Sequence, residues 1–164
     1  MMTRDNKKKR WLRMLAFAML LTASVILRPA SSRGSDLGFR VGYFFDAQAL
    51  SIGMEVLNSL DNHSQWYFNP NVEMAMGDER NVAAFNGDFH YDLDSTSNTA
   101  VWLGAGPALL ITDPDGRGGD TEVDPALNMF VGLGAKTGTY RPFIQMKGII
   151  SDNSDAALAV GIRF

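Results

Sequence analysis

The ionisable residues of the segment DFHYD, residues 88–92, have the types and spacing that could support catalysis or metal binding. Asp88, His90 and Asp92 follow one another at every second position, and in an extended strand such side chains point to the same side. A histidine between carboxylates can act as a general base or bind a metal ion. The chain has no cysteine, and no serine nucleophile can be assigned to this histidine from the sequence. We therefore predict no catalytic role and no metal site here.

The segment TDPDGRGGDTEVDP, residues 112–125, is a second candidate because it is rich in carboxylates and glycine. Its acidic residues are Asp113, Asp115, Asp120, Glu122 and Asp124. Such hard oxygen ligands suit calcium, but their spacing differs from that of an EF-hand loop, and a single GGD is not a nonapeptide repeat. We predict a solvated acidic loop, with calcium binding as the alternative, and we expect no cofactor.

The elements that must position these residues are strands, because from residue 37 onward the polarity alternates with a period of two. Short clusters rich in Asp, Asn, Ser, Thr and Gly separate the alternating segments, as turns do. The eight predicted strands are 37–46, 49–58, 65–77, 81–93, 99–112, 125–136, 140–151 and 155–164. No helical segment lies between them, so the sequence predicts an all-β, eight-stranded, antiparallel up-and-down barrel, in which closure removes both edge strands.

The two faces of the predicted strands differ in composition. The positions in phase with the large apolar residues contain no charged, amide, serine or threonine side chain. The opposite positions are rich in glycine and alanine and carry a few charges of both signs, whereas a water-facing exterior would be rich in lysine and glutamate. We predict that the apolar set faces lipid and the mixed set fills a narrow lumen, so the barrel is transmembrane. A soluble, lipocalin-like binding barrel in the periplasm is the alternative, since alternation alone does not define which face points outward.

Several ionisable residues belong to the predicted lumen face. They are Arg40, Glu55, Glu73, Asp88, His90, Lys147 and Arg163. Buried charges are costly unless they are paired, so we predict a structural network of ion pairs that fills the barrel. A narrow passive pore or a proton-linked path is the alternative, although eight strands seldom leave an open channel.

The N-terminal segment differs in charge from the rest of the chain. Residues 1–32 carry seven Lys or Arg and one acid, whereas the remaining 132 residues carry eight basic and seventeen acidic residues, a net charge of −9. A basic start, an apolar stretch at 14–27 and small residues near Ser32 are typical of a cleavable signal peptide. We therefore predict a signal peptide at 1–32 and a barrel domain at 33–164. An uncleaved anchor helix is the alternative, and this charge distribution is not that of a nucleic-acid-binding protein.

The C-terminal residues LAVGIRF, together with the glycine-rich segments WLGAGPALLI and FVGLGAK, resemble the small eight-stranded outer-membrane β-barrel proteins of the OmpX and OmpA type. The resemblance covers residues 37–164. In that family a terminal aromatic, preceded by apolar residues at alternate positions, is the insertion signal for the barrel-assembly machinery. The matching residues here are Leu158, Val160, Ile162 and Phe164.

The resemblance implies a bacterial outer-membrane location, contact with membrane lipid and lipopolysaccharide, and a monomer. The terminal pattern says nothing about activity, and we predict a structural or surface-interaction role without catalysis. Some small barrels modify lipid A, which is the enzymatic alternative, but their deacylase type carries a His-x-Ser-Asn pattern that follows neither His63 nor His90. With both termini in the periplasm, the connections near 47–48, 78–80, 113–124 and 152–154 are expected to face outward.

Overall fold

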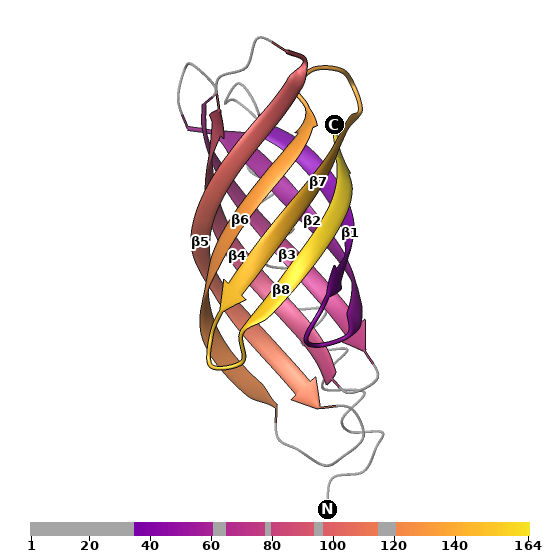
Figure 1. The fold of residues 1–164 in the computed structure, drawn as a ribbon, viewed down its shortest axis with the longest axis vertical. Helices are drawn as coiled ribbons and strands as arrows, with labels where there is room; N and C mark the ends of the chain where they lie inside the picture. Colours follow the sequence, from indigo (N-terminus) through magenta and orange to yellow (C-terminus); the bar gives the residue numbers. More distant parts are fainter. Residues whose placement is uncertain (1–34, 61–64, 78–79, 94–96, 115–120) are drawn as a thin grey trace, which may run out of the picture. The chain divides into compact units, whose positions relative to one another are not determined.

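The fold is an eight-stranded antiparallel β-barrel, as the sequence predicts. The computed structural model describes residues 35–60, 65–77, 80–93, 97–114 and 121–164, and Figure 1 shows its strands wound around a common axis. The strands are β1 (Ser35–Phe44), β2 (Ala49–Ser59), β3 (Trp66–Gly77), β4 (Arg80–Leu93), β5 (Thr99–Pro114), β6 (Glu122–Ala135), β7 (Arg141–Ile150) and β8 (Asp155–Arg163).

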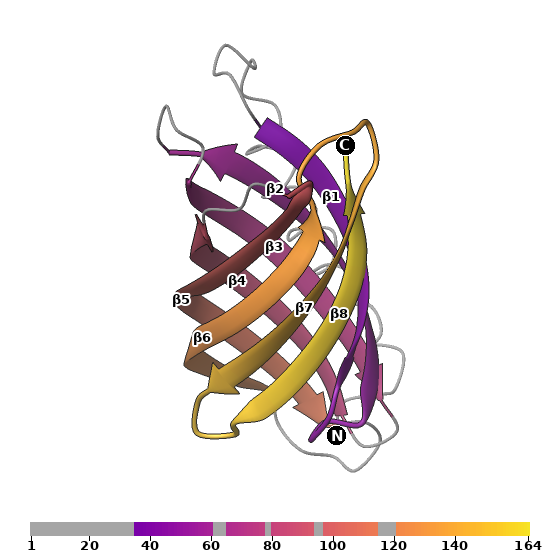
Figure 2. The same ribbon diagram turned by 45° about the horizontal axis from the view of Figure 1, so that its top comes forward.

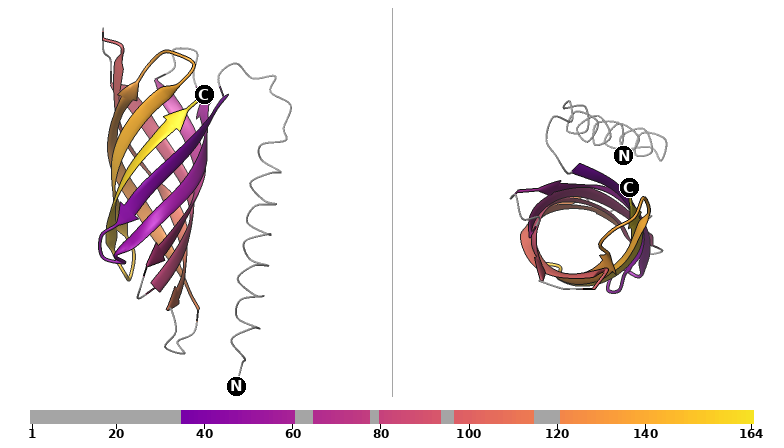
Figure 3. Two further views of the ribbon diagram at one scale, coloured as in Figure 1. Left: turned by 90° about the vertical axis from the view of Figure 1, so that its right-hand side faces the viewer. Right: turned by 90° about the horizontal axis from the view of Figure 1, so that it is seen from above.

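The sheet closes on itself because β1 pairs with both β2 and β8. Seen along its axis in Figure 3, the barrel is a complete ring. The last residue takes part in the closure: the Phe164 N–H donates to the Leu37 carbonyl at 2.9 Å, and the Leu37 N–H donates to the Phe164 carbonyl at 3.0 Å. The eight described strands therefore leave no edge that could pair with another chain. None of the described residues forms a helix long and apolar enough to cross a membrane.

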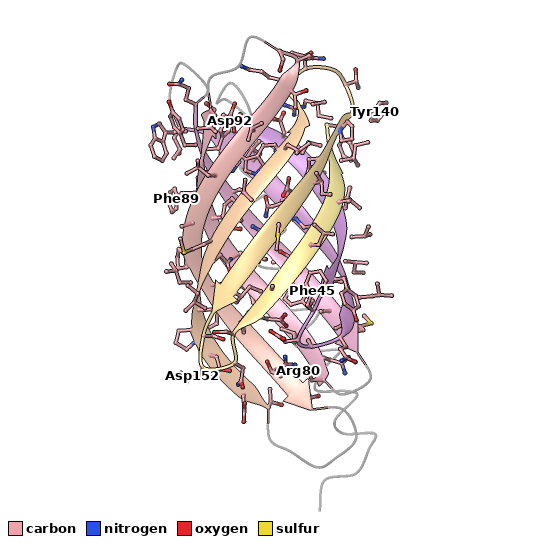
Figure 4. The ribbon with its side chains drawn as sticks, viewed as in Figure 1. Phe45, Arg80, Phe89, Asp92, Tyr140 and Asp152 are labelled. Atoms are coloured by element: carbon pink, nitrogen blue, oxygen red, sulfur yellow. The ribbon has the colours of Figure 1, made fainter. Side chains whose placement is uncertain are left out.

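The alternation of side chains confirms the predicted faces of the wall. In β2, Leu50 is 72% exposed, whereas its neighbours Ala49 and Ser51 are 0% and 5% exposed. The same contrast recurs around the barrel, where large apolar side chains point away from the axis (Figure 4). An exterior of this kind is unfavourable in water and favourable in hydrocarbon.

The barrel has two ends, to which we give fixed names. The C-terminal rim carries Phe164 and the β2–β3, β4–β5 and β6–β7 connections, and the distal rim carries the other four connections (Figure 2). Figure 4 places Asp92 and Tyr140 toward the C-terminal rim and Arg80 and Asp152 toward the distal rim.

The β1–β2 turn at the distal rim is held by a side chain from the far end of the sequence. Asp155 accepts hydrogen bonds from the N–H groups of Asp46 and Ala47, at 2.9 and 3.1 Å. Gln48 adopts a positive φ of 47°, the left-handed conformation that lets the chain reverse direction.

The acidic connection is shorter than the sequence predicted. β5 continues to Pro114 and β6 begins at Glu122, so Asp113 pairs with Asn81, and Glu122 with Thr112, in the ladders. Main-chain pairing does not depend on an apolar side chain, so the strands continue beyond the apolar band. The predicted signal peptide and the centre of the calcium candidate, residues 115–120, lie outside the described residues.

Candidate functional site

The candidate site is the lumen, and its centre is a network of ion pairs drawn from five strands. Glu55 of β2 pairs with Arg40 of β1 and accepts a hydrogen bond from Arg163 Nε of β8 at 2.5 Å. Glu73 of β3 accepts from Lys147 Nζ of β7 at 2.5 Å and from Arg40 Nη1 at 3.3 Å. Each of the five residues is at most 6% exposed. Arg40 therefore joins the two glutamates into one network across the barrel.

Asp88, the third buried carboxylate, is held by amides. Asn71 Nδ2 and Asn128 Nδ2 each donate to one of its oxygens at 2.9 Å. Asn86 then links the two asparagines, because it donates to Asn71 Oδ1 at 2.7 Å and accepts from Asn128 at 2.8 Å. The alternation along β3, β4 and β6 puts these three asparagines on the lumen face, but alternation does not identify them as partners of Asp88.

The buried charges of the described lumen balance. The cations are Arg40, Lys147 and Arg163, and the carboxylates are Glu55, Glu73 and Asp88. An unbalanced charge in this position would have neither water nor a counter-ion to stabilise it. Neutrality is therefore what an interior of buried charges requires.

An apolar layer closes the lumen on the side of the distal rim. Seven strands and the β1–β2 turn contribute to it. Its buried members are Phe44, Ala47, Ala49, Ala75, Val82, Ala84, Leu110, Ile149 and Ala157. Lys147 Nζ lies 5.8 Å from the centre of the Phe44 ring, so the charged centre borders directly on this layer.

An aromatic layer closes the lumen on the side of the C-terminal rim. Trp102, Phe130 and Phe143 form it together with Ala100. The guanidinium of Arg163 lies 4.8 Å from the ring centre of Trp102 and 4.4 Å from that of Phe143, within the range of cation–π attraction. Together the two layers enclose the charged centre.

Two glycines make the aromatic layer possible. A Cβ atom at Gly132 would lie 2.4 Å from the indole of Trp102, and one at Gly161 would lie 2.4 Å from the ring of Phe143. Non-bonded carbon atoms pack at about 3.5–4.0 Å, so neither position accepts a side chain unless an aromatic ring moves. The glycine-rich strands of the sequence thus match large rings on neighbouring strands.

The structure places Asp88, His90 and Asp92 on one face of β4, as predicted, but gives them different surroundings. His90 Nε2 is 3.4 Å from Asp92 Oδ1, while Asp88 is bound to amides. Rings of Tyr67 and Trp102 lie 5.1 and 5.7 Å from the imidazole centre. Within the described part of the chain, neither imidazole nitrogen has a hydrogen-bond partner, and no group of three or more His, Asp or Glu side chains is placed to hold a metal ion.

The residues of the predicted insertion signal lie on the outer face of β8 and at its end. Leu158, Val160 and Phe164 are exposed, and the Phe164 ring lies 5.8 Å from that of Phe39 and 6.3 Å from that of Tyr140. This aromatic cluster stands at the C-terminal rim, where aromatic side chains of membrane barrels meet the lipid–water interface.

Comparison with known proteins finds similarity in structure but not in sequence. No family model and no curated protein sequence matches the chain. The crystal structure of Neisserial surface protein A superposes with a TM-score of 0.59 at 14% identity, covering 79% of this chain and 92% of that one. The crystal structure of Ail, the attachment invasion locus protein of Yersinia pestis, gives 0.53 at 12% identity, covering 79% and 96%. A de novo designed transmembrane β-barrel gives 0.52 at 11% identity, covering 82% and 97%.

Independently of these similarities, the strand register closes a ring of eight strands, and the exposed side chains show that the exterior of the wall is apolar. The chain therefore has the fold of the small eight-stranded outer-membrane β-barrel proteins.

Proposed function

We propose that the protein is an integral outer-membrane β-barrel with a structural or surface-interaction role and without catalytic activity. The observation that carries this proposal is the closed lumen: a neutral network of charges lies between two apolar layers, inside a wall whose exterior is apolar. The apolar exterior of such a barrel favours insertion in a membrane. With the lumen filled by side chains, its outer wall and its rims are the surfaces that can contact lipid or other molecules.

The closed lumen argues against the passive pore. Buried apolar side chains lie on the distal side of the charged centre and buried aromatic rings on the other side, and the charged side chains of the described lumen are paired with one another. Planar-bilayer recording of the refolded protein tests this point, because no stepwise conductance is expected. Steps that persist across preparations would favour the pore.

The surroundings of His90 argue against a catalytic role. Its ring is covered by Tyr67, Trp102 and Phe130, and a general base must reach the proton it removes, directly or through one water. Mass spectrometry of lipid A from a deletion strain and its parent tests the enzymatic alternative, and identical lipid A profiles are expected.

The proposal includes export by an N-terminal signal peptide, insertion by the barrel-assembly machinery through Phe164 and the apolar residues before it, and residence as a monomer in contact with lipid and lipopolysaccharide. It also includes an orientation with the distal rim outside the cell. The described acidic residues at or near that rim are Asp46, Asp113, Glu122, Asp124, Asp152 and Asp155. Arg80 accompanies them, 3.7 Å from Asp155, so the outer surface would be acidic.

Fractionation with a pair of epitope tags tests location and orientation together. The protein is expected in the outer-membrane fraction and in solution only with detergent. A tag inserted after Asn153, in the β7–β8 turn, should be accessible to antibody on intact cells, and a tag after Gly138, in the β6–β7 turn, should be protected. Recovery in the soluble periplasm would contradict the membrane location, and the reverse labelling would contradict only the orientation.

A further inference from the structure

The outer wall carries a groove that crosses five strands near the C-terminal rim. Two rows of outward-facing side chains border it, and each row follows the register of the strands around the barrel. One row is Phe39, Ile162, Pro142, Ala135 and Thr99, and the other is Val41, Val160, Ile144 and Leu133. We call this groove the outer trough; its volume is about 890 Å³.

The floor of the outer trough is main chain. Between the two rows lie inward-facing residues, among them Gly134, Phe143 and Gly161, whose side-chain positions point to the lumen or are empty. The walls of the groove are apolar except at Asn98 and Thr99. No charged side chain reaches outward from its floor, because the lining residue Arg40 is buried in the lumen. Five strands spaced about 4.8 Å apart give it a length of roughly 19 Å, slightly more than the roughly 15 Å of hydrocarbon in one leaflet.

The outer trough begins at the rim and descends into the apolar band. Thr99 is the first residue of β5 and Ala135 is the last of β6, whereas Phe39 lies four residues inside β1. The strands are tilted, as barrel closure requires, so the groove runs obliquely from the interface into hydrocarbon. An acyl chain of a lipid likewise extends from its headgroup at the interface into the hydrocarbon.

A polar cluster with a lysine lies at the rim end of the outer trough. The Lys136 N–H donates to the Asn98 carbonyl at 2.9 Å, and Thr137 Oγ1 lies 2.5 Å from Asn98 Oδ1. Asn98, Lys136 and Thr137 are all exposed. Arg141, a second cation at this rim, has its charge engaged by Asp36 at 2.5 Å.

We propose that the outer trough binds one acyl chain of an anionic glycerophospholipid, with the lipid phosphate beside Lys136. The site combines an apolar groove of acyl length with a positive charge at its interfacial end. An anionic glycerophospholipid complements both features, because its acyl chain is apolar and its phosphate is negatively charged. This proposal rests on the membrane location proposed above. It adds a defined lipid and a defined site at the C-terminal rim.

The test is native mass spectrometry of the protein purified from outer membranes in mild detergent, with equal amounts of phosphatidylglycerol and phosphatidylcholine added. One cation near an anionic headgroup is worth about a fivefold difference in binding, so the wild type should retain about fivefold more phosphatidylglycerol. Lys136→Gln should abolish the preference. Ala135→Phe, which fills the trough beside Lys136, should abolish retention of the bound lipid.

Two matched controls accompany these variants. Ala105→Phe adds the same ring at another outward-facing position, on β5 outside the trough, and Arg80→Gln removes a cation at the opposite rim. Both should retain lipid as the wild type does. Each protein is first shown to be folded by its heat-modifiable mobility, so that a failure to insert in membranes is recognised separately from a failure to bind lipid.

Three results would overturn the proposal. They are equal retention of the two lipids by the wild type, a preference that survives Lys136→Gln, and the same loss of lipid in Ala105→Phe as in Ala135→Phe. A dimer that Ala135→Phe dissociates would also overturn it, because the occupant of the trough would then be a second copy of the chain.

Discussion

Replacement of Glu73 by glutamine tests whether the charged network stabilises the barrel. Glu73 Oε1 receives both Lys147 Nζ and Arg40 Nη1, and glutamine keeps an oxygen acceptor of the same length. The change therefore removes the charge and little else. It leaves Lys147 with no carboxylate partner among the described residues and the buried lumen with one cation in excess.

The expected magnitude follows from the cost of an uncompensated buried charge. Removing one member of a buried ion pair typically costs 3–5 kcal/mol, and the retained acceptor reduces this, so we expect a loss of about 3 kcal/mol in the free energy of unfolding. Lys147→Met should cost a similar amount. The double variant restores neutrality and places a thioether near the Phe44 ring, so its loss should be smaller than the sum of the two single losses by about 2 kcal/mol.

The assay is reversible urea unfolding in phospholipid vesicles, followed by tryptophan fluorescence. Glu122→Gln serves as the matched control, because it removes a carboxylate from an exposed position on β6, and it should change the free energy of unfolding by less than about 0.5 kcal/mol. The reasoning is refuted if Glu73→Gln is as stable as this control. It is also refuted if the losses of Glu73→Gln and Lys147→Met simply add.

Three further substitutions test the wall, the packing and the C-terminus. Val160→Arg should destabilise the inserted barrel by roughly 2–4 kcal/mol, because it places a charge in hydrocarbon, and wild-type stability in vesicles would contradict the assigned faces. Gly132→Val should cost about 1–3 kcal/mol in the same assay, because its Cβ would overlap the Trp102 ring, whereas Gly148→Val, with 3.8 Å to its nearest neighbour, should be nearly neutral. Phe164→Ser should lower the amount of heat-modifiable barrel in outer-membrane fractions, and an unchanged amount would mean that the terminal aromatic is not needed for assembly.

The faces of the wall could be predicted from the sequence because they depend on a local property. Side chains alternate along every strand, so one outward residue such as Leu50 assigns its neighbours as well. Closure between β1 and β8 could also be predicted. In a meander with an even number of strands the last strand is antiparallel to the first, and pairing the two removes both edges.

The partners inside the lumen could not be predicted, because they depend on the height of each residue along the barrel axis. Glu73 and Lys147 are 74 positions apart, and Asp88 and Asn128 are 40 apart. Their levels are set by the stagger that accumulates from strand to strand around the barrel. Alternation gives the face of a residue but not this stagger. Alternation could therefore predict which charged residues face the lumen. The hydrogen bonds from amides to Asp88 and the aromatic rings around His90 could not be predicted without the strand register.

The closed lumen also separates the effects of substitutions inside and outside the wall. Glu73→Gln and Lys136→Gln each remove one charge, but the first lies in the sealed interior and the second on an exposed turn. The interior variant should lower stability and leave the preference for phosphatidylglycerol unchanged, because Glu73 does not line the outer trough. The exterior variant, Lys136→Gln, should leave stability unchanged and abolish the preference for phosphatidylglycerol. If either substitution changed both properties, the wall would not isolate the lumen from the lipid-facing surface, and a role confined to the exterior of the barrel would lose its physical basis.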